Sequence, residues 1–553
     1  LNHDDADGSI AIGFSAGAAI TSGLGNVAIG YQAMDAEDDG DANTAVGYQA
    51  FTQLNAASGY GAGVAIGYVA GAALTTGVNN TIVGAYALDA ATTALNNVAI
   101  GTEAMSAVPS GQAVDGCVAI GYQALTGAGG TTTGANNSIA IGSQSLKALT
   151  TGAGNIAIGY TALTACQTGA DNVVVGYQAG EDLTGSNCTF IGAGAGMQST
   201  AGNNTAVGHD AGGSMTTWDS NTAIGKQALQ GQSGQAMNYC TAIGASALAS
   251  GSITTAANGT TAVGHAALTA LTSGANNIAI GYQALDALTT SAHNLAIGVD
   301  ALGTGTYDCD YNVAIGNYTL DACTAGAAVT GNVAVGYAAG SAVTTSDNGV
   351  FVGYLAGNAI TTGNNNVAIG SGAMLVHTTG GENIAIGKGA MDDTNNDAAN
   401  LGSNYNIFIG SDSGGGTWAG TNASQYNTAV GHYTMDAVLT GAEQNVAMGY
   451  AALGALVTGD SNTCIGTSTG LAIAGGSENT MVGRNAGDAI VDSGGNCLLG
   501  ANTLTASTNG HNNIVIGADA GDDATDIGYA VIIGDGAGSG VLTNAADGTI
   551  LIG

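Results

Sequence analysis

Carboxylates are the most numerous titratable side chains of this 553-residue sequence, with 39 Asp and Glu. Four short stretches gather several of them: Asp35, Glu37, Asp38, Asp39 and Asp41; Asp308 and Asp310; Asp392, Asp393 and Asp397; and Asp519, Asp522, Asp523 and Asp526. Ca²⁺ takes six to eight oxygen ligands from carboxylates and carbonyls, so these loops could supply part of a calcium site. None has the full spacing of a known calcium-binding loop, and a plain solvated acidic face is the alternative.

The nucleophilic and metal-binding side chains are scattered along the chain. Eight cysteines occur singly, and the seven histidines are dispersed. No H-E-x-x-H occurs, and no G-x-S-x-G lies in a strand-turn-helix context. We expect the cysteines to be small buried hydrophobes, since their spacing does not suggest a disulfide framework. The sequence therefore predicts no catalytic residue, no resident cofactor and no enzymatic activity.

Aromatic side chains follow a repeated phrase. Asn277-Ile278-Ala279-Ile280-Gly281 returns 17 residues later as Asn294-Leu295-Ala296-Ile297-Gly298. The residue after the final glycine is Tyr in ten copies: Tyr31, Tyr48, Tyr68, Tyr122, Tyr160, Tyr177, Tyr282, Tyr337, Tyr354 and Tyr450. Histidine, Lys and Arg occur at the same position in other copies, so we expect it to face solvent at least in part. Tyrosines packed flat in an outer groove are one interpretation, and an aromatic ladder for glycans or another surface is the other.

Two tryptophans lie in the connections between copies of the phrase, Trp218 in T-T-W-D-S and Trp418 in G-T-W-A-G. Exposed aromatics on loops are good candidates for specific contact. A tryptophan packed over a corner of the fold is an equal alternative. We group both with the tyrosines as a candidate recognition surface.

The elements that must position these residues are set by the phrase itself. Thirty-one copies end in glycine, from Gly13 to Gly553, and 17 of the 30 intervals are 17 residues long. Fixed self-similarity at a short period is the signature of a solenoid. Large, small and large residues alternate before each glycine, which predicts a β-strand. We expect one continuous β-solenoid over residues 1–553, with about 31 coils.

The columns of the repeat predict how a coil is filled. We expect the large residues Ile278 and Ile280 to fill the coil, and small residues such as Ala279 and Ala284 to face a neighbouring chain. Asn stands four residues before the glycine in 21 of 31 copies. There it suits the corner that enters the strand, and its amide can bond from coil to coil. After the strand we expect a second short strand or an extended turn, then a Gly/Thr/Asn loop.

Composition limits the partners. The chain has 4 Lys and Arg against 39 Asp and Glu, a formal charge of −35, with 95 Gly and one Pro. Nucleic-acid binding is not expected, because it draws on clustered cations. No uninterrupted apolar run approaches the ~20 residues that cross a bilayer, so we expect no membrane insertion. No secretion signal is visible, and we interpret the sequence as a fragment of a longer chain.

The phrases N-N-V-A-I-G, N-N-I-A-I-G and N-T-A-V-G resemble the N-[ST]-[VA]-A-I-G repeats in the head domains of trimeric autotransporter adhesins, the YadA-like left-handed β-roll. The longer N-N-V-A-I-G-Y-Q-A-L…T-T-G phrase is similar to repeats of phage tail-fibre proteins. The resemblance covers all 553 residues. It implies a homotrimer on a cell or virion surface that binds a receptor or glycan. The sequence departs from the adhesin heads in its longer coil and in lacking a neck, stalk or anchor.

Repeat and resemblance together predict an all-β, β-roll-like solenoid that forms an extracellular, non-enzymatic fibre. The function predicted is that of an adhesin, or of a virion receptor-binding or tail-fibre shaft. The alternative is a structural filament in which chains assemble end to end. An ice-binding solenoid is a more distant alternative, because its flat face would need regular Thr rows.

Overall fold

The computed structural model describes residues 8–55, 61–108, 114–127, 134–231, 237–250, 257–304, 309–323, 329–394, 402–418, 422–540, 542–543 and 546–553. These residues form three-residue β-strands joined by turns, and they contain no α-helix. The predicted all-β solenoid with a 17-residue repeat is confirmed. The chain divides into two units, residues 1–276 and 277–553, which are described one at a time. The expectation of one continuous array stays a prediction.

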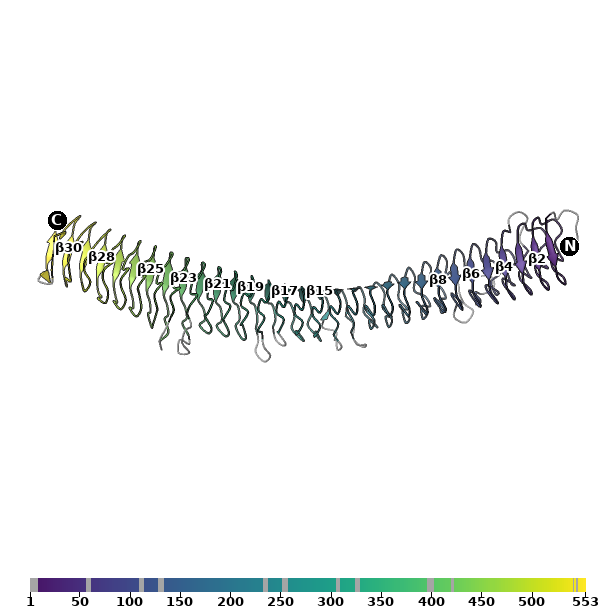
Figure 1. Ribbon diagram of the computed structural model, residues 1–553, viewed down its shortest axis with the longest axis horizontal. Coiled ribbons are helices and arrows are strands. Elements are labelled where there is room, and N and C mark those ends of the chain that lie inside the picture. Colours follow the sequence, from purple (N-terminus) through teal and green to yellow (C-terminus); the bar gives the residue numbers. More distant parts are fainter. Residues whose placement is uncertain are drawn as a thin grey trace. The chain divides into compact units, whose positions relative to one another are not determined.

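Unit 1 is a parallel ladder in which each strand pairs with the next along the chain (Figure 1). Equivalent residues of successive coils lie opposite each other, as Ala11 lies opposite Ala28. The strands are β1 (Ile10–Ile12), β2 (Val27–Ile29), β3 (Thr44–Val46), β4 (Val64–Ile66), β5 (Thr81–Val83), β6 (Val98–Ile100), β7 (Val118–Ile120), β8 (Ile139–Ile141), β9 (Ile156–Ile158), β10 (Val173–Val175), β11 (Thr189–Ile191), β12 (Thr205–Val207), β13 (Thr222–Ile224), β14 (Thr241–Ile243) and β15 (Thr261–Val263).

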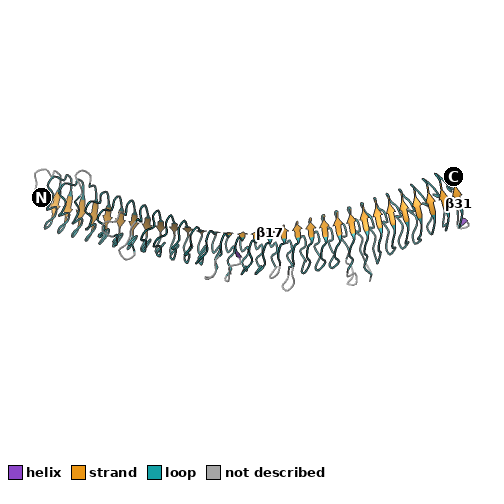
Figure 2. Ribbon diagram, turned by 180° about the vertical axis from the view of Figure 1, so that it is seen from behind, coloured by secondary structure: helices purple, strands orange, loops and turns teal. Residues whose placement is uncertain are grey.

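Unit 2 repeats the arrangement, with one strand in every coil and the connections on the other side (Figure 2). Its strands are β16 (Ile278–Ile280), β17 (Leu295–Ile297), β18 (Val313–Ile315), β19 (Val333–Val335), β20 (Val350–Val352), β21 (Val367–Ile369), β22 (Ile384–Ile386), β23 (Ile407–Ile409), β24 (Thr428–Val430), β25 (Val446–Met448), β26 (Thr463–Ile465), β27 (Thr480–Val482), β28 (Cys497–Leu499), β29 (Ile514–Ile516), β30 (Val531–Ile533) and β31 (Ile550–Ile552).

The segment after each strand is a turn, and no second strand forms there among the described residues. The second and fourth residues after the glycine have left-handed backbones, as in Asp300 (φ 49°) and Leu302 (φ 51°). Alternating backbone handedness points successive N–H groups toward opposite neighbours. Asp300 N–H donates to Tyr282 O of the preceding coil at 3.0 Å, and Leu302 N–H donates to Thr319 O of the next coil at 2.9 Å. The coil-to-coil ladder therefore continues through the turn.

The interior of the coil is filled by the residues that we expected outside. Ala279, Ala284 and Leu285 are fully buried, whereas Ile278 and Ile280 are 39% and 37% exposed. The prediction that the aliphatic rows fill the coil and the alanines face a neighbour is wrong. Leu285, turned inward by its left-handed backbone, occupies the interior, and opposite it the coil has room for only a small strand residue. The β-branched side chains consequently lie on the outer face of the sheet.

A size compensation seen in several coils supports this assignment. Where the middle strand residue is large, the fourth residue after the glycine is often glycine, as in the pairs Phe351 with Gly357 and Phe408 with Gly414. A Cβ on Gly357 would lie 2.5 Å from the ring of Phe351, and one on Gly414 would lie 2.6 Å from the ring of Phe408. Both phenylalanines are fully buried. The two positions therefore share one interior space.

The asparagines four residues before the glycine form a buried amide ladder, which confirms the predicted coil-to-coil bonding. Asn479 Nδ2 donates to Asn462 Oδ1 at 2.9 Å and to Ser493 O at 3.0 Å. Its Oδ1 accepts from the backbone N–H of Asn496 at 3.1 Å and from Asn496 Nδ2 at 3.0 Å. One side chain thus joins neighbouring coils on both sides.

The glycine that ends each strand is required by close approach of the next coil. Gly370 has φ +135°, and a Cβ there would lie 2.3 Å from the carbonyl oxygen of Gly387. Such a contact is a steric clash, and an L-residue rarely adopts this backbone conformation. The glycine column lets successive coils stack at strand spacing.

Candidate functional site

The tyrosines that follow the strands form an exposed row on each unit. All ten are between 42% and 56% exposed, which confirms that the position faces solvent. Several stack ring on ring along the coils: the ring centroids of Tyr31 and Tyr48 are 5.1 Å apart with an interplanar angle of 9°, and those of Tyr48 and Tyr68 are also 5.1 Å apart. The stacks Tyr160–Tyr177 and Tyr337–Tyr354 are similar. The regular coil spacing produces this order.

Stacking decides which part of each ring can meet a ligand. Phe14 lies on the other side of Tyr31 with centroids 5.5 Å apart, so Tyr31 and Tyr48 each have aromatic neighbours on both faces. Sugars usually pack against an open aromatic face. Inside a stack, only the ring edges and the hydroxyl groups remain for contact with another surface. The row is therefore better suited to hydrogen bonding than to sugar stacking.

A second aromatic row precedes the strands, and we did not predict it. It occupies the position five residues before the glycine, where Tyr311 is 64% and Tyr426 is 52% exposed. Ring centroids of His293 and Tyr311 are 5.1 Å apart, and those of Tyr405 and Tyr426 are 5.2 Å apart. Aligning the sequence on the glycine would have shown this column, because most other coils hold Gly, Asn or another non-aromatic residue there.

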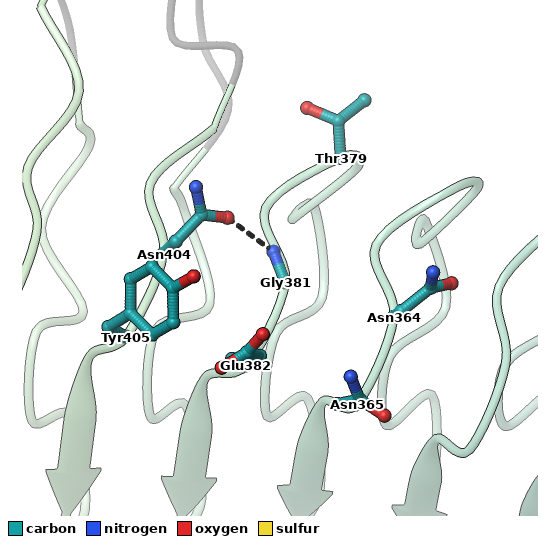
Figure 3. A pocket seen from close by; sticks show the side chains of 7 residues that line it. All are labelled: Asn364, Asn365, Thr379, Gly381, Glu382, Asn404 and Tyr405. Carbon is teal, nitrogen blue, oxygen red and sulfur yellow. Dashed lines mark hydrogen bonds between the residues drawn. The ribbon is translucent and has the colours of Figure 1, made fainter.

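The same corner holds a shallow polar cavity of about 250 Å³ in unit 2 (Figure 3). Three consecutive coils line it with Asn364, Asn365, Thr379, Gly381, Glu382, Asn404 and Tyr405. Asn404 Oδ1 accepts a hydrogen bond from Gly381 N–H at 2.7 Å (Figure 3). The lining offers amide, carboxylate and phenol groups, and it is open to solvent along the coil edge.

Both tryptophans are buried, so the alternative of packing over a corner is the one the structure supports. Trp218 and Trp418 have no exposed surface. Trp418 Nε1 donates to Gly414 O at 3.1 Å, and its ring meets Phe408 edge-on with centroids 5.7 Å apart. Neither side chain contributes to a contact surface.

Three acidic side chains come close together in the first predicted acidic stretch. One ligand atom from each of Glu37, Asp38 and Asp39 lies within 4.8 Å of the others. Glu37 is buried and accepts a hydrogen bond from Gly40 N–H at 2.7 Å. Burial also raises the pKa of Asp35 above its usual value. Of the other acids named from the sequence, Asp308 and Asp397 lie outside the described residues.

Two further carboxylate groups in unit 2 have the same plan and were not predicted as groups, although Asp392 was named from the sequence with Asp393 and Asp397. Each group spans three consecutive coils. The two outer coils each contribute the Asp that stands five residues after the strand-ending glycine. The middle coil contributes an Asp two residues after its glycine, and it has Gly in place of Asp at the fifth residue. The first group is Asp286, Asp300, Asp321 and Gly303, and it lines a cavity of about 380 Å³. The second is Asp392, Asp412, Asp436 and Gly415. Members lie in different coils, so only alignment on the glycine would have revealed them.

Burial and mutual repulsion raise the pKa values in these groups. Burial, then the charge of Asp412, raises the pKa of Asp392 to about 6. The same two causes, in the same order, raise the pKa of Asp436. A Cβ on Gly415 would lie 3.1 Å from a carboxylate oxygen of each of these two residues. The carboxyls with a raised pKa in these groups therefore bind protons at a higher pH than an ordinary exposed Asp does.

One pair of cysteines is joined, contrary to the expectation that no disulfide forms. Cys309 and Cys323 are 14 residues apart and form a disulfide bond. They lie seven residues before and seven after Gly316, and a coil that closes on itself brings these positions together. Cys117, Cys166, Cys188, Cys240 and Cys464 are buried thiols as predicted, and Cys497 is exposed. Burial raises the pKa of Cys464 to about 12, so this thiol is unreactive.

His377 is the one buried histidine among the described residues. Its Nδ1 lies 2.9 Å from Thr394 Oγ1, and its Nε2 lies 2.9 Å from Gly380 O. Burial lowers its pKa below the usual value. The ring is therefore held neutral as part of the coil interior.

No family model and no curated protein matches the chain. Within the described part of the chain, no helix has the length and apolar character to cross a membrane.

Proposed function

We propose that the protein is a non-enzymatic structural fibre, the shaft of an extracellular adhesin or of a virion receptor-binding fibre. The observation that supports this best is the uniformity of the coils in each unit. One strand, one buried asparagine corner and one inward turn recur with the same register. A catalytic site needs unlike groups brought together once, whereas these coils repeat like groups many times.

Attachment is assigned to the tyrosine row and to the aromatic and polar corner before the strands. Residues of these columns are largely exposed and range over aromatic, charged and small side chains from coil to coil, whereas the glycine that ends the strand is invariant and the interior stays apolar. Residues on a rigid scaffold that are free to vary are the usual carriers of recognition. The resemblance to adhesin and tail-fibre repeats supports a receptor or glycan as partner, a homotrimer as the working form and a cell or virion surface as the location.

Binding to intact surfaces tests the proposal. Fluorescently labelled protein is titrated onto bacterial and animal cells and onto a glycan array. We expect saturable binding to at least one surface, weakened at least tenfold by Y160S together with Y177S, since these remove two adjacent hydroxyl groups and one ring stack. The matched control replaces the exposed turn residues Thr184 and Thr200 of the same unit with Ser. No saturable binding to any surface would contradict the proposal, and open-ended polymers seen by electron microscopy would favour the filament instead.

A further inference from the structure

The outer face of unit 2 carries two continuous aliphatic rows. In β16 to β23 the first and third residue of every strand point outward, and each is partly exposed. We call these sixteen residues the aliphatic face: Ile278, Ile280, Leu295, Ile297, Val313, Ile315, Val333, Val335, Val350, Val352, Val367, Ile369, Ile384, Ile386, Ile407 and Ile409. None of them carries a polar or charged group.

The aliphatic face is too large to be an ordinary exposed patch. Eight coils at about 4.8 Å each give a stripe roughly 40 Å long. If each side chain exposes about a third of its surface, the stripe offers on the order of 800 Å² of apolar area, which matches one side of a standard protein interface. The largest patch on a typical monomer is about 300–600 Å². An apolar area of this size favours association.

We infer that the aliphatic face is covered by a second copy of this chain, lying side by side with the first. Charge is the first reason. The chain has a formal charge of −35, so two copies repel each other over most approaches. In these coils Asp286, Asp300 and Asp321 lie in the turns that follow the strands, whereas Asp310, Asp347 and Glu382 lie at the corner before the strands, outside the aliphatic rows. The aliphatic face is a surface on which two copies can meet without burying a charge.

The repeat is the second reason. The face is ridged at the coil spacing, because successive strands pair in register, as Val333 pairs with Val350 and Val350 with Val367. A partner that packs tightly over eight coils needs ridges at the same spacing. Another copy of this solenoid presents that spacing, and a lipid or irregular protein surface does not.

This inference rests on the proposed function, in which the working form is a homo-oligomer, and it adds the surface through which the copies contact each other. It does not depend on attachment. A chain that associates through the aliphatic face but binds no cell, or that binds cells as a single copy, would separate the two claims.

Sedimentation velocity of the full chain from about 0.1 to 50 μM tests the inference. We expect the wild type to form assemblies of two or more copies. The double variant V333E and V350E places two charges on the face and should weaken association at least tenfold. The control A342E and A359E adds the same charges to the same coils, beyond the strands, and should associate as the wild type does.

A milder variant guards against misfolding. Threonine already occupies the row of Val333 in other coils, for example at Thr428, Thr463 and Thr480, so V333T, V350T and V367T together should fold. We expect this triple variant to retain the wild-type circular dichroism spectrum and to associate at least threefold more weakly.

Three results would overturn the inference. The first is a wild type that remains a single copy at 50 μM. The second is that the face variants associate as tightly as the wild type. The third is that the wild type remains a single copy and binds uncharged phosphatidylcholine vesicles, with V333E and V350E abolishing that binding.

Discussion

The amide ladder gives the sharpest energetic prediction, at Asn479. The change N479A removes four hydrogen bonds, two donated by Nδ2 and two accepted by Oδ1. It leaves the backbone N–H of Asn496 without this partner in a position closed to water, and the carbonyl of half-buried Ser493 also loses a donor. Asn479 has no exposed surface, and Asn496 is 1% exposed.

The magnitude follows from the cost of unmet hydrogen bonds. Each buried group left without a partner costs about 1–3 kcal/mol, and the alanine leaves a small cavity as well. We therefore expect the free energy of local opening around β27 and β28 to fall by about 3 kcal/mol, which corresponds to roughly a hundredfold change in the opening equilibrium. Coils far along unit 2 should change little, because each coil contacts its neighbours only.

Native-state hydrogen exchange, measured by mass spectrometry on peptides of unit 2, is the assay. The matched control is N364A, where an exposed asparagine accepts one hydrogen bond from Asp347 N–H at 2.9 Å. We expect its exchange to change by less than about fivefold. If N479A changed exchange around β27 by no more than the control does, the ladder would not stabilise the coil as described.

Three further predictions concern pH and glycine. Burial raises the pKa of Asp392 to about 6, so at this residue the folded protein binds protons more tightly than the unfolded chain does. The contribution of Asp392 to stability is therefore fully present below about pH 3.8 and is lost as pH rises through 6. D392N should flatten this part of a plot of Tm against pH. The pKa of buried His377 is lowered, so the contribution of this residue to stability falls as pH drops below about 6.5. Faster hydrogen exchange near β21 at pH 5 in the wild type, but not in H377N, would show this. G370A should lower Tm by several degrees, because its Cβ would lie 2.3 Å from Gly387 O. G372N should fold normally, since nothing lies within 4 Å of a Cβ at that position. Equal losses of Tm in both variants would contradict the argument that close approach of the next coil requires glycine.

The strands, the repeat and the asparagine corner were predictable, because each depends on local properties of the phrase. Alternation at Ile278, Ala279 and Ile280 defines a strand wherever it lies, and the stacked asparagines have few other partners. Which face of the strand lies inside was not predictable from alternation. That choice depends on the turn, where Leu285 adopts a left-handed backbone (φ 53°) that propensity reserves for Gly and Asn, and so turns its side chain inward.

The candidate site likewise has parts that the sequence predicts and parts that it does not. The exposed tyrosine row could be predicted, because a column that accepts Tyr, His and Lys indicates solvent. Ring stacking could not, since it depends on the coil spacing and on side-chain rotamers. The buried tryptophans and the Cys309–Cys323 bond depend on how a connection folds back over its own coil, and no short pattern in the sequence reports this.

The central claim is that each coil buries the middle residue of its strand and exposes the two on either side. Charge scanning across β21 tests it most directly, using V367E, A368E and I369E with circular dichroism and hydrogen exchange as the readouts. We predict that A368E opens the coils around β21, because it places a carboxylate in the interior, while V367E and I369E keep the fold. The reverse result, a tolerated A368E with V367E and I369E unfolded, would contradict the account.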